Sequence, residues 1–461
     1  MSFSFLRLAT RSASSPIGRC STSPRLVRTF LSTSSKWHSS SGSPGLLPPH
    51  LLTLADLSTS QIQALLNNAA NFKASLTAHN HDLVMGAVAF DDGSELEQTL
   101  KNKTVALLFT KRSTRTRVAS ETSAVALGGH PMFLGPSDIQ LGVNESLYDT
   151  AKVVGSMVDG IMARVDGHEE VELLAQHAGV PVINALSDLY HPTQILADLL
   201  TMVEAFPTNT SSSKSPACLS SLAGLKVAWV GDSNNILNDM LVALPRLGIH
   251  LSVATPKGYD RNERVWGTMQ DGIEEERKKG GSVTVAGVDW SNDPKEAVRD
   301  ADIIVTDTWI SMGEESSKEQ RLRDFSGFQV TEALGREGGA KTDWKFMHCL
   351  PRKSQEVDDE VFYGKRSIVF PEAENRKWTI MSVFEWVFRV ATRAQHEQRN
   401  ERVWEERPLT HSRFLIAVHT WDVGRSEASS SVCINVVSSV SGDGRSADSY
   451  KYNLPKLVDL A

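Results

Sequence analysis

Residues 109–117 read Phe-Thr-Lys-Arg-Ser-Thr-Arg-Thr-Arg and lie between a strand-like apolar stretch, 104–109, and a helix-like stretch, 118–127. The first backbone N–H groups of a helix have no partner within the helix, and the positive end of the helix dipole lies there. Hydroxyl and guanidinium groups at such a turn favour binding of a phosphate. Because Arg115 and Arg117 diverge by roughly 200° on a helix, we expect one to face a ligand and the other a structural carboxylate. The alternative is a solvated basic helix start.

A second polar cluster has the same placement. Residues 188–194 read Asp-Leu-Tyr-His-Pro-Thr-Gln, follow the strand candidate 180–185, and open a helix expected over 195–206. His191 precedes a proline, which disfavours helical dihedral angles, so its imidazole projects from the turn. Gln194 offers an amide donor and acceptor one turn later. Ligands of open α/β sheets bind at the carboxyl ends of strands, so we expect both clusters to line one site.

Short apolar runs alternate with helix-length periodic segments along the whole central part of the chain. This alternation predicts an α/β fold with two doubly wound parallel-sheet domains joined by interdomain helices. The expected strands are 104–109, 131–134, 160–164 and 180–184 in the first half, and 225–231, 250–254, 282–286, 302–306, 345–348 and 367–370 in the second.

Seven short motifs resemble the aspartate/ornithine carbamoyltransferase family. Its carbamoyl-phosphate half is matched by Ser-Thr-Arg-Thr-Arg at 113–117, Ala-Arg-Val at 163–165 and His-Pro-Thr-Gln at 191–194. The ornithine-specific signatures follow in family order: Gly-Asp-Ser-Asn-Asn at 231–235, Asp-Thr-Trp-Ile-Ser-Met-Gly at 307–313, His-Cys-Leu-Pro-Arg at 348–352 and Glu-Ala-Glu-Asn-Arg at 372–376. The resemblance implies transfer of the carbamoyl group of carbamoyl phosphate to the side-chain amine of L-ornithine, giving L-citrulline and phosphate in arginine biosynthesis.

The resemblance also assigns residues to carbamoyl phosphate. Thr116, Arg164 and His191 would donate to the carbamoyl oxygen, and Gln194 would hold the carbamoyl NH₂. From the residues alone, Arg164 could instead be a surface arginine paired with Asp166. The full set implied is Ser113, Thr114, Arg115, Thr116, Arg164, His191, Gln194, Cys349, Leu350, Arg376 and, from a neighbouring subunit of a homotrimer, Gln140.

For ornithine, the resemblance implies that Asn235 holds the α-carboxylate, while Asp307, Ser311 and Met312 hold the α-amino end. The implied catalytic residues are Cys349, Asp307, Arg164 and His191.

Three roles are open for Cys349. It would act as a base with Asp307 only if a cation such as Arg376 lowered its pKa from about 8.5; Arg376 could equally be a second phosphate ligand. Covalent catalysis and a buried structural thiol are the alternatives.

Composition narrows the class of protein. The chain of 461 residues is 40% hydrophobic and 22% charged, with a net charge of −7, and it has no apolar run of transmembrane length. We therefore expect no membrane partner, and the acidic balance argues against nucleic acid. The four cysteines, at 20, 218, 349 and 433, show no zinc-ligand spacing. We expect no metal and no cofactor.

The first 50 residues contain five arginines and Lys36 but no acidic residue, and they are rich in serine. This composition is typical of a mitochondrial transit peptide, and it predicts a mitochondrial matrix protein; a disordered basic tail is the alternative. Without these six cations, 42 cationic side chains face 55 acidic ones, a net charge of −13.

The last part of the chain departs from the family pattern. Residues 391–461 are Ser-rich without a clear period, so we expect disorder, in either a genuine extension or the product of a misassigned splice site or reading frame.

Two other functions stay open: carbamoylation of another amine such as aspartate, and a catalytically weakened regulatory paralogue. The expected organisation is a transit peptide at 1–36, a carbamoyl-phosphate domain at 48–206, a polar loop at 207–220, an ornithine domain at 221–372, a C-terminal helix at 373–390 and an atypical tail at 391–461.

Overall fold

A computed structural model describes residues 49–78, 97–137, 145–207, 217–280, 285–310 and 317–405, with side chains up to residue 392. All of these belong to one structural unit, Pro44–Ala461. The segment expected to be a transit peptide and the tail beyond residue 405 lie outside the described residues. Within the described part, no helix is long and apolar enough to cross a membrane.

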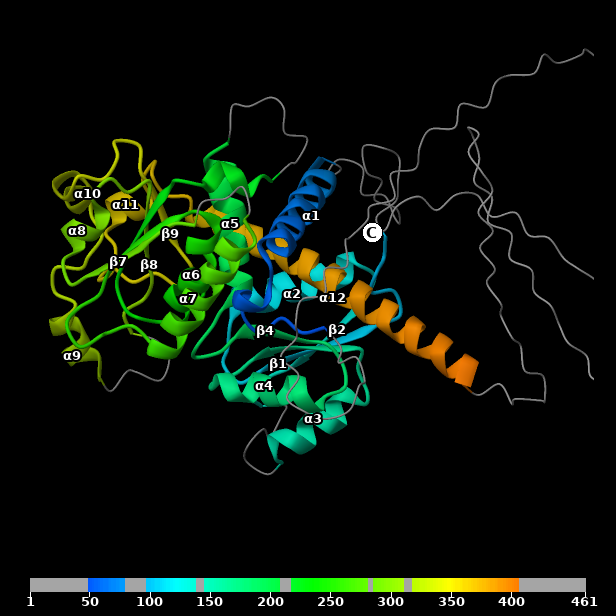
Figure 1. The fold of residues 1–461 in the computed structure, drawn as a ribbon. Coiled ribbons are helices and arrows are strands. Elements are labelled where there is room, and N and C mark those ends of the chain that lie inside the picture. Colours follow the sequence, from blue (N-terminus) through cyan, green and yellow to red (C-terminus); the bar gives the residue numbers. More distant parts are fainter. Residues whose placement is uncertain are drawn as a thin grey trace, which may run out of the picture. The chain divides into compact units, whose positions relative to one another are not determined.

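The first sheet has four parallel strands in the order β2-β1-β3-β4. The chain runs from β1 to β2 on one side and then returns to β3 and β4 on the other (Figure 1). The strands are β1 Thr104–Phe109, β2 His130–Leu134, β3 Gly160–Arg164 and β4 Val182–Leu186. Their helices are α1 Thr59–Ala78, α2 Thr114–Ala126, α3 Leu147–Gly155, α4 His168–His177 and α5 Pro192–Ala205, after a 3₁₀ turn η1 Leu54–Asp56.

The second sheet has five parallel strands in the order β7-β6-β5-β8-β9. The strands are β5 Lys226–Val230, β6 His250–Ala254, β7 Val288–Ser291, β8 Ile303–Thr306 and β9 Lys345–His348. The accompanying helices are α6 Asn235–Ala243, α7 Glu263–Lys278, α8 Pro294–Val298, α9 Lys318–Asp324, α10 Glu332–Gly338, α11 Asp359–Phe362 and α12 Val369–Glu405, with 3₁₀ turns η2 Leu219–Leu222 and η3 Pro245–Leu247. The predicted fold class, two doubly wound parallel sheets, is confirmed.

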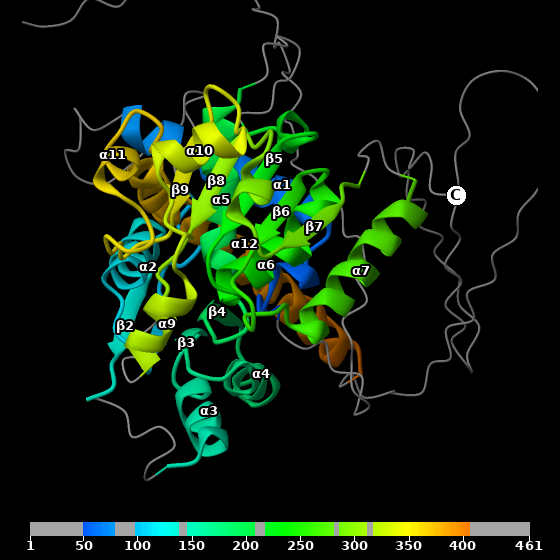
Figure 2. The same ribbon diagram turned by 90° about the vertical axis from the view of Figure 1, so that its left-hand side faces the viewer.

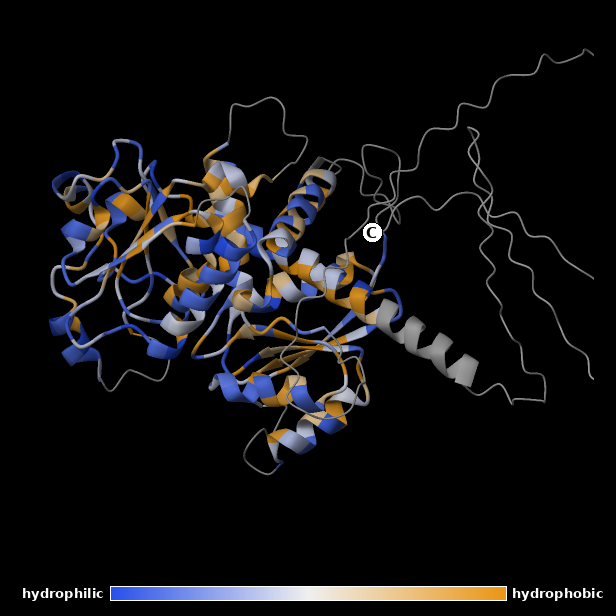
Figure 3. Cartoon of the chain, in the orientation of Figure 1, coloured by the Kyte–Doolittle hydropathy of each residue, from blue (hydrophilic) through white to orange (hydrophobic). Residues whose placement is uncertain are grey.

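Successive residues of the central strands enter different cores because side chains alternate across a sheet. In β1, Val105, Leu107 and Phe109 belong to one core cluster, whereas Ala106 and Leu108 belong to another. Figure 3 shows the hydrophobic colour concentrated on the strands and on the helix faces that cover them. Both faces of the first sheet are therefore covered, as expected for a parallel sheet.

One of these clusters is shared by both sheets. It contains Val105 of β1 and Trp229 of β5, together with Leu196 of α5 and Phe384 of α12. In the views of Figures 1 and 2, α5 and α12 lie between the two sheets, and α3 packs beside α4 at the outer face of the first. Helices α5 and α12 are therefore the interdomain connection that the fold prediction required.

The last helix differs from its predicted bounds. A strand was expected at 367–370, but Ser367 makes only an isolated bridge to Phe346, and α12 begins at Val369. The helix also continues past residue 390 to Glu405, into the segment expected to be disordered. Its apolar stripe packs against the first sheet so closely that a Cβ on Gly160 would lie 2.5 Å from Phe388 Cζ.

Two further strands differ from their predicted bounds by more than one residue. The strand expected at 282–286 is wrong for residues 285 and 286; the strand β7 lies at 288–291, and 281–284 are outside the described residues. Strand β4 begins at Val182 rather than at 180. The ends of short strands are hard to predict from sequence because apolar residues in the adjoining loops look like a continuation of the strand.

Candidate active site

Both sheets reverse their strand order once, and the site residues lie at those two points. In the first sheet the reversal is at β1 and β3, where Phe109 pairs with Arg164. In the second it is at β5 and β8, where Asn234 Nδ2 donates to Asp307 Oδ2 at 2.8 Å. Ligands of doubly wound folds bind beside such reversals, at the carboxyl ends of the strands.

The turn after β1 caps helix α2 as its sequence predicts. Ser113 is the N-cap residue, and its Oγ accepts a hydrogen bond from Thr116 N at 3.3 Å. Arg115 donates to the carbonyl oxygen of Leu350, in the other half of the chain. Arg117 instead pairs with Glu121 at 2.9 Å, so the expected divergence of the two arginines is confirmed.

Arg164 ends β3 with a side chain that is 8% exposed. Its Nε has no hydrogen-bond partner, and Asp166, the local partner considered from the sequence, pairs with Lys111 at 2.6 Å. Burial, followed by the positive charge of Arg115, lowers the pKa of Arg164 to about 10. A buried guanidinium without a counter-charge is costly unless a ligand supplies one.

Arg376 reaches the same place from α12. Its Nη1 donates to Gln194 Oε1 at 2.6 Å, and its Nη2 donates to Thr116 Oγ1 at 3.2 Å and Thr193 Oγ1 at 3.3 Å. Its Nε, like that of Arg164, is buried without a partner. Burial and then Arg115 lower the pKa of Arg376 to about 10.

His191 is the N-cap residue of α5, with non-helical dihedral angles (φ −139°, ψ 65°) as its following proline predicts. The imidazole is 5% exposed. Burial, and then the charges of Arg376, Arg164 and Arg115, hold its pKa well below the usual range. His191 is therefore a neutral imidazole in the middle of three cations.

Gln194 lies one turn along α5 and is 1% exposed. Its Nε2 donates to Asp198 Oδ1 at 2.8 Å and to Glu372 Oε1 at 3.0 Å, while its Oε1 accepts from Arg376. The side chains of Asp198 and Glu372 are 2% exposed.

The second half of the site centres on Asp307, which follows β8. Its carboxylate accepts hydrogen bonds from Asn234 Nδ2, from the Cys349 thiol at 3.0 Å and from Thr308 N at 2.7 Å. Asn235, expected at the substrate carboxylate, begins α6 and donates from Nδ2 to Ser187 O at 2.6 Å. Of the two asparagines, it is Asn234 that donates to Asp307, and the sequence prediction did not select Asn234.

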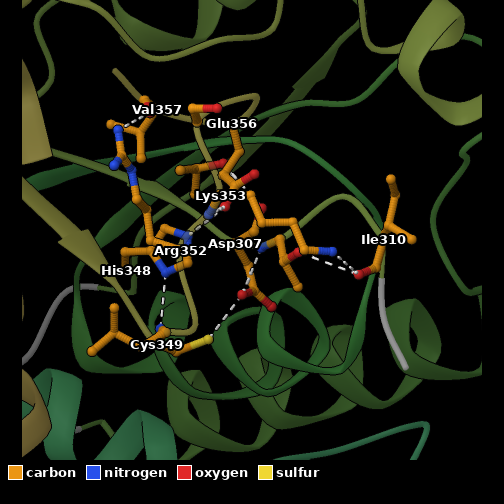
Figure 4. A network of polar contacts seen from close by, with 12 residues as sticks. Asp307, Ile310, His348, Cys349, Arg352, Lys353, Glu356 and Val357 are labelled. Atoms are coloured by element: carbon orange, nitrogen blue, oxygen red, sulfur yellow. Dashed lines mark hydrogen bonds and ion pairs between the residues drawn. The ribbon is translucent and has the colours of Figure 1, made fainter. Parts of the chain in front are cut away.

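Figure 4 shows Cys349 pointing toward Asp307 from the turn after β9. The half-buried thiol loses hydration, and this, followed by the negative charge of Asp307, raises its pKa well above the usual range. A pKa lowered by Arg376 was the condition for a thiolate base, and that condition is not met: Cys349 is a neutral thiol.

Hydrogen bonds also hold the rest of this turn in place, and Figure 4 shows the side chains of His348 and Lys353 that make them. His348 Nδ1 accepts from Leu350 N at 2.8 Å, and Lys353 Nζ donates to Ile310 O at 3.1 Å. Leu350 has φ +62°, a left-handed conformation that costs a non-glycine residue about 1–3 kcal/mol and is found mainly at functional sites. The Leu350 carbonyl is thereby directed to Arg115.

Three expected site residues, Gln140, Ser311 and Met312, lie outside the described residues. Thr114 is described, and it occupies the exposed first position of α2.

Sequence reasoning also assigned no role to three buried acids: Asp198, Asp239 and Glu372, the last of which opens the motif at 372–376. Asp239 is fully buried and accepts from His191 N at 2.6 Å and from Thr53 Oγ1 at 3.0 Å. A signal was present, because Asp198 and Asp239 each interrupt an apolar helical run, and a charged residue is rarely buried without a specific partner.

A group of possible metal ligands exists in the described part of the chain: atoms of Asp307, His348 and Cys349 lie within 4.8 Å of one another. His348 Nδ1 already accepts from Leu350 N, and His348 Nε2 lies 3.5 Å from Glu356 Oε1. Metal binding would have to break one of these contacts and remove the thiol proton, so the donor set fits a hydrogen-bonded network better than a metal centre.

Known families match both halves of the chain. The profile described as "Aspartate/ornithine carbamoyltransferase, carbamoyl-P binding domain" matches residues 49–204, and the profile of the "Asp/Orn binding domain" matches residues 223–387. The mitochondrial ornithine carbamoyltransferase of Emericella nidulans is 50% identical over 338 residues, which cover 73% of this chain and 88% of that protein. The corresponding Schizosaccharomyces pombe protein is 48% identical over 339 residues, 73% of this chain and 94% of the relative.

Solved structures agree. The crystal structure of a mitochondrial ornithine carbamoyltransferase from Coccidioides immitis has 45% sequence identity and a TM-score of 0.64, and the match covers 75% of this chain and 99% of that one. The Thermus thermophilus ornithine carbamoyltransferase has 38% identity and a TM-score of 0.59, with 74% and 99% covered. The chain belongs to the aspartate/ornithine carbamoyltransferase family.

Proposed function

We propose that this chain is an ornithine carbamoyltransferase, which transfers the carbamoyl group of carbamoyl phosphate to the side-chain amine of L-ornithine and releases L-citrulline and phosphate. One observation carries the proposal. The guanidinium groups of Arg115, Arg164 and Arg376, which come from α2, β3 and α12, all lie close enough to His191 to lower its pKa, and Arg376 also donates to Thr116 on α2. Among the described residues, none of the three forms an ion pair with a carboxylate.

Their charge argues for a polyanionic ligand. Like charges held together out of water repel strongly, and a buried cation is stable only with a counter-charge. A phosphate group carries up to two negative charges and presents oxygens suited to the planar guanidinium fork. Carbamoyl phosphate satisfies this requirement, and the hydroxyls of Ser113 and Thr116 at the start of α2 add donors to the same site.

The carbamoyl group then lies toward α5. We assign Arg164, Thr116 and neutral His191 to its oxygen, where they would stabilise the oxyanion that develops as the carbonyl carbon is attacked. Gln194 and Leu350 face its NH₂ group. Because His191 is uncharged, it can act as a neutral donor without adding a fourth cation to the cluster.

The ornithine end is acidic. Asp307 would receive the α-ammonium with Ser311 and Met312, and Asn235 would receive the α-carboxylate. The neutral δ-amine attacks the carbonyl carbon, and the bond from that carbon to the phosphate oxygen breaks. The proton lost from nitrogen passes through the Cys349 thiol to Asp307, along the 3.0 Å hydrogen bond that joins them. An aspartate substrate would bring a second carboxylate toward Asp307, which electrostatics disfavours.

A citrulline-formation assay tests the proposal. Purified protein lacking about the first 36 residues should convert ornithine and carbamoyl phosphate to equal amounts of citrulline and phosphate without added metal, and aspartate should be inert. Formation of carbamoyl aspartate would favour the other substrate, whereas folded protein that binds carbamoyl phosphate without turnover would indicate a regulatory paralogue.

The proposed assembly is a homotrimer in the mitochondrial matrix, in line with the mitochondrial names of the relatives. Val118 and Val125 on α2 and Met132 on the edge strand β2 are 54%, 61% and 41% exposed. This apolar strip suits a subunit contact, and the segment that contains Gln140 follows β2.

Mixed assemblies test the shared site. Gln140→Ala and Arg164→Ala subunits, each nearly inactive, should regain activity when refolded together, because some sites then combine an intact segment from one chain with an intact pocket from the other. Verified mixed trimers that stay inactive would place Gln140 in its own chain's site.

A further inference from the structure

Two buried acids contact Gln194, the residue that the proposed function places at the carbamoyl NH₂ group. Asp198 belongs to α5 and Glu372 to α12, and both carboxyl groups surround the amide of Gln194. Glu372 also accepts from His348 N through its second oxygen, at 3.0 Å. The pair therefore connects Gln194 to the turn that carries Cys349.

The amide of Gln194 has only one possible orientation in this environment. Both hydrogens of Nε2 are used, one by Asp198 Oδ1 and one by Glu372 Oε1. On the other side, Oε1 faces the guanidinium of Arg376. A reversed amide would place its oxygen against two carboxyl groups and its NH₂ against a cation. A carbonyl oxygen has two lone pairs, and Arg376 uses one, so Gln194 retains acceptor capacity only.

We propose that Asp198 and Glu372 are positioning residues that hold the oxygen of Gln194 toward the ligand, and that the site thereby selects a carbamoyl NH₂ group over the methyl group of an acyl phosphate such as acetyl phosphate. The inference rests on the proposed function and adds a specificity determinant to it. An NH₂ group donates to the fixed oxygen, whereas a methyl group leaves that oxygen unpaired and desolvated, which weakens binding.

The electrostatics of the pair are consistent with this role. Two carboxyl groups so close cannot both ionise at modest cost. Burial, the largest cause, raises the pKa of Asp198 to about 7, and burial together with the charge of Asp198 raises that of Glu372 well above its usual range. Because both pKa values are raised, the pair does not carry two full negative charges at neutral pH. A single negative charge is enough to bind the Gln194 NH₂ group by charge-assisted hydrogen bonds and to offset part of the Arg376 charge.

The test uses two stable probes of equal charge in the full chain: phosphonoacetamide, which carries an amide NH₂, and acetonylphosphonate, which carries a methyl group in its place. Calorimetric titration without ornithine gives the ratio of the two dissociation constants. The wild-type protein should prefer the amide by about tenfold to hundredfold. A change in net charge or a loosened pocket alters the affinity for both probes. Such effects therefore largely cancel in the ratio of the two dissociation constants.

The variants separate orientation from charge. Asp198→Asn keeps an acceptor for Gln194 and supplies an N–H to Glu372, so it should keep the preference. Asp198→Ala removes one acceptor and should reduce the preference about threefold or more. The double variant Asp198→Asn/Glu372→Gln has no negative charge, and the single amide oxygen at position 372 cannot accept from both Gln194 and His348 N, as the two carboxylate oxygens do. It should lower the preference about tenfold.

The outcomes are distinct. An unchanged preference in the folded double variant overturns the proposal; if that variant does not fold, equal preferences in Asp198→Ala and Asp198→Asn overturn it. A wild-type protein that forms citrulline but binds both probes equally also refutes the positioning role while leaving the proposed function intact. Failure of the wild-type protein to form citrulline refutes the proposed function instead.

Discussion

The two ends of the site differ in how their charges are balanced. At the phosphate end, Arg164 and Arg376 are buried with an Nε that has no partner, and each has a pKa lowered to about 10. At the ornithine end, Asp307 accepts three hydrogen bonds from neighbouring groups. The first end stores unfavourable electrostatic energy that an anion would release, whereas the second is largely satisfied before any substrate arrives. The comparison indicates that carbamoyl phosphate binding should stabilise the fold more than ornithine binding does.

The largest loss of activity is expected from a substitution at the phosphate end of the site. Arg164→Ala should reduce kcat/KM about a thousandfold, because it removes a buried donor to the developing oxyanion. Without ligand, the same change should leave the melting temperature unchanged or raised, since one uncompensated buried cation is lost. A large drop in the melting temperature of the ligand-free protein would mean that Arg164 has a structural partner.

A smaller effect should follow at the start of α2, where a matched control exists. Arg115→Ala should weaken carbamoyl phosphate binding about a hundredfold, since a guanidinium at an oxyanion site has no shorter substitute. Arg117→Ala, on the same helix, should change it less than about twofold, because Arg117 pairs with exposed Glu121. Equal effects in direct titration would contradict the divergence of the two arginines.

The interdomain contact through Asp239 should appear as a pH dependence of stability. Burial raises the pKa of Asp239 from 3.8 to about 7, so the folded chain binds more protons than the unfolded chain between these values. The free energy of unfolding contributed by Asp239 therefore decreases as pH rises from 4 to 7, by about 2 kcal/mol between pH 5 and 7.

Comparison with Asp239→Asn isolates this contribution. His50, whose pKa burial lowers to about 4, acts in the opposite direction in both proteins, so only the difference between them reports on Asp239. Chemical unfolding at pH 5, 6 and 7 should give a less negative slope of stability with pH in the variant. Parallel slopes would show that Asp239 is ionised across this range.

The smallest effect concerns the thiol at the ornithine end. Iodoacetamide reacts with thiolates, so at pH 8 Cys349 should be alkylated at least about tenfold more slowly than Cys218 in the same chain. Asp307→Asn should speed the reaction at Cys349, because it removes the charge that helps raise the pKa. Peptide mass spectrometry follows both sites. If Cys349 reacted as fast as Cys218, the result would support the hypothesis that Cys349 acts as a thiolate base.

Much of the fold followed from local patterns, and the errors are local too. Strands β1, β3 and β6 have their predicted bounds, because apolar runs between turn residues identify buried parallel strands. The segment 367–370 looked like another such run, but its last two residues begin α12. Val369 is buried in the core cluster of the second sheet, whereas Phe370 is exposed, so the tertiary context at the start of α12 overrode the extended pattern.

The site shows a similar division. The Ser113 cap and the projecting His191 follow from their own neighbours in sequence. Asn234 and Asn235 are adjacent and chemically identical, so no local pattern could tell which amide would reach Asp307. That choice depended on where α6 starts relative to β8.

By itself, the sequence determined two parallel sheets, polar turns at the carboxyl ends of their strands, and the Ser113 cap at the start of α2, because periodicity and helix capping depend on residues a few positions apart. Only the tertiary structure decided that Arg376 lies beside Gln194, that Asp198 and Glu372 both accept hydrogen bonds from its amide, and that burial raises the pKa of the Cys349 thiol. The physical reason is that desolvation and charge coupling depend on every group around an atom, and those groups come from segments far apart in the chain.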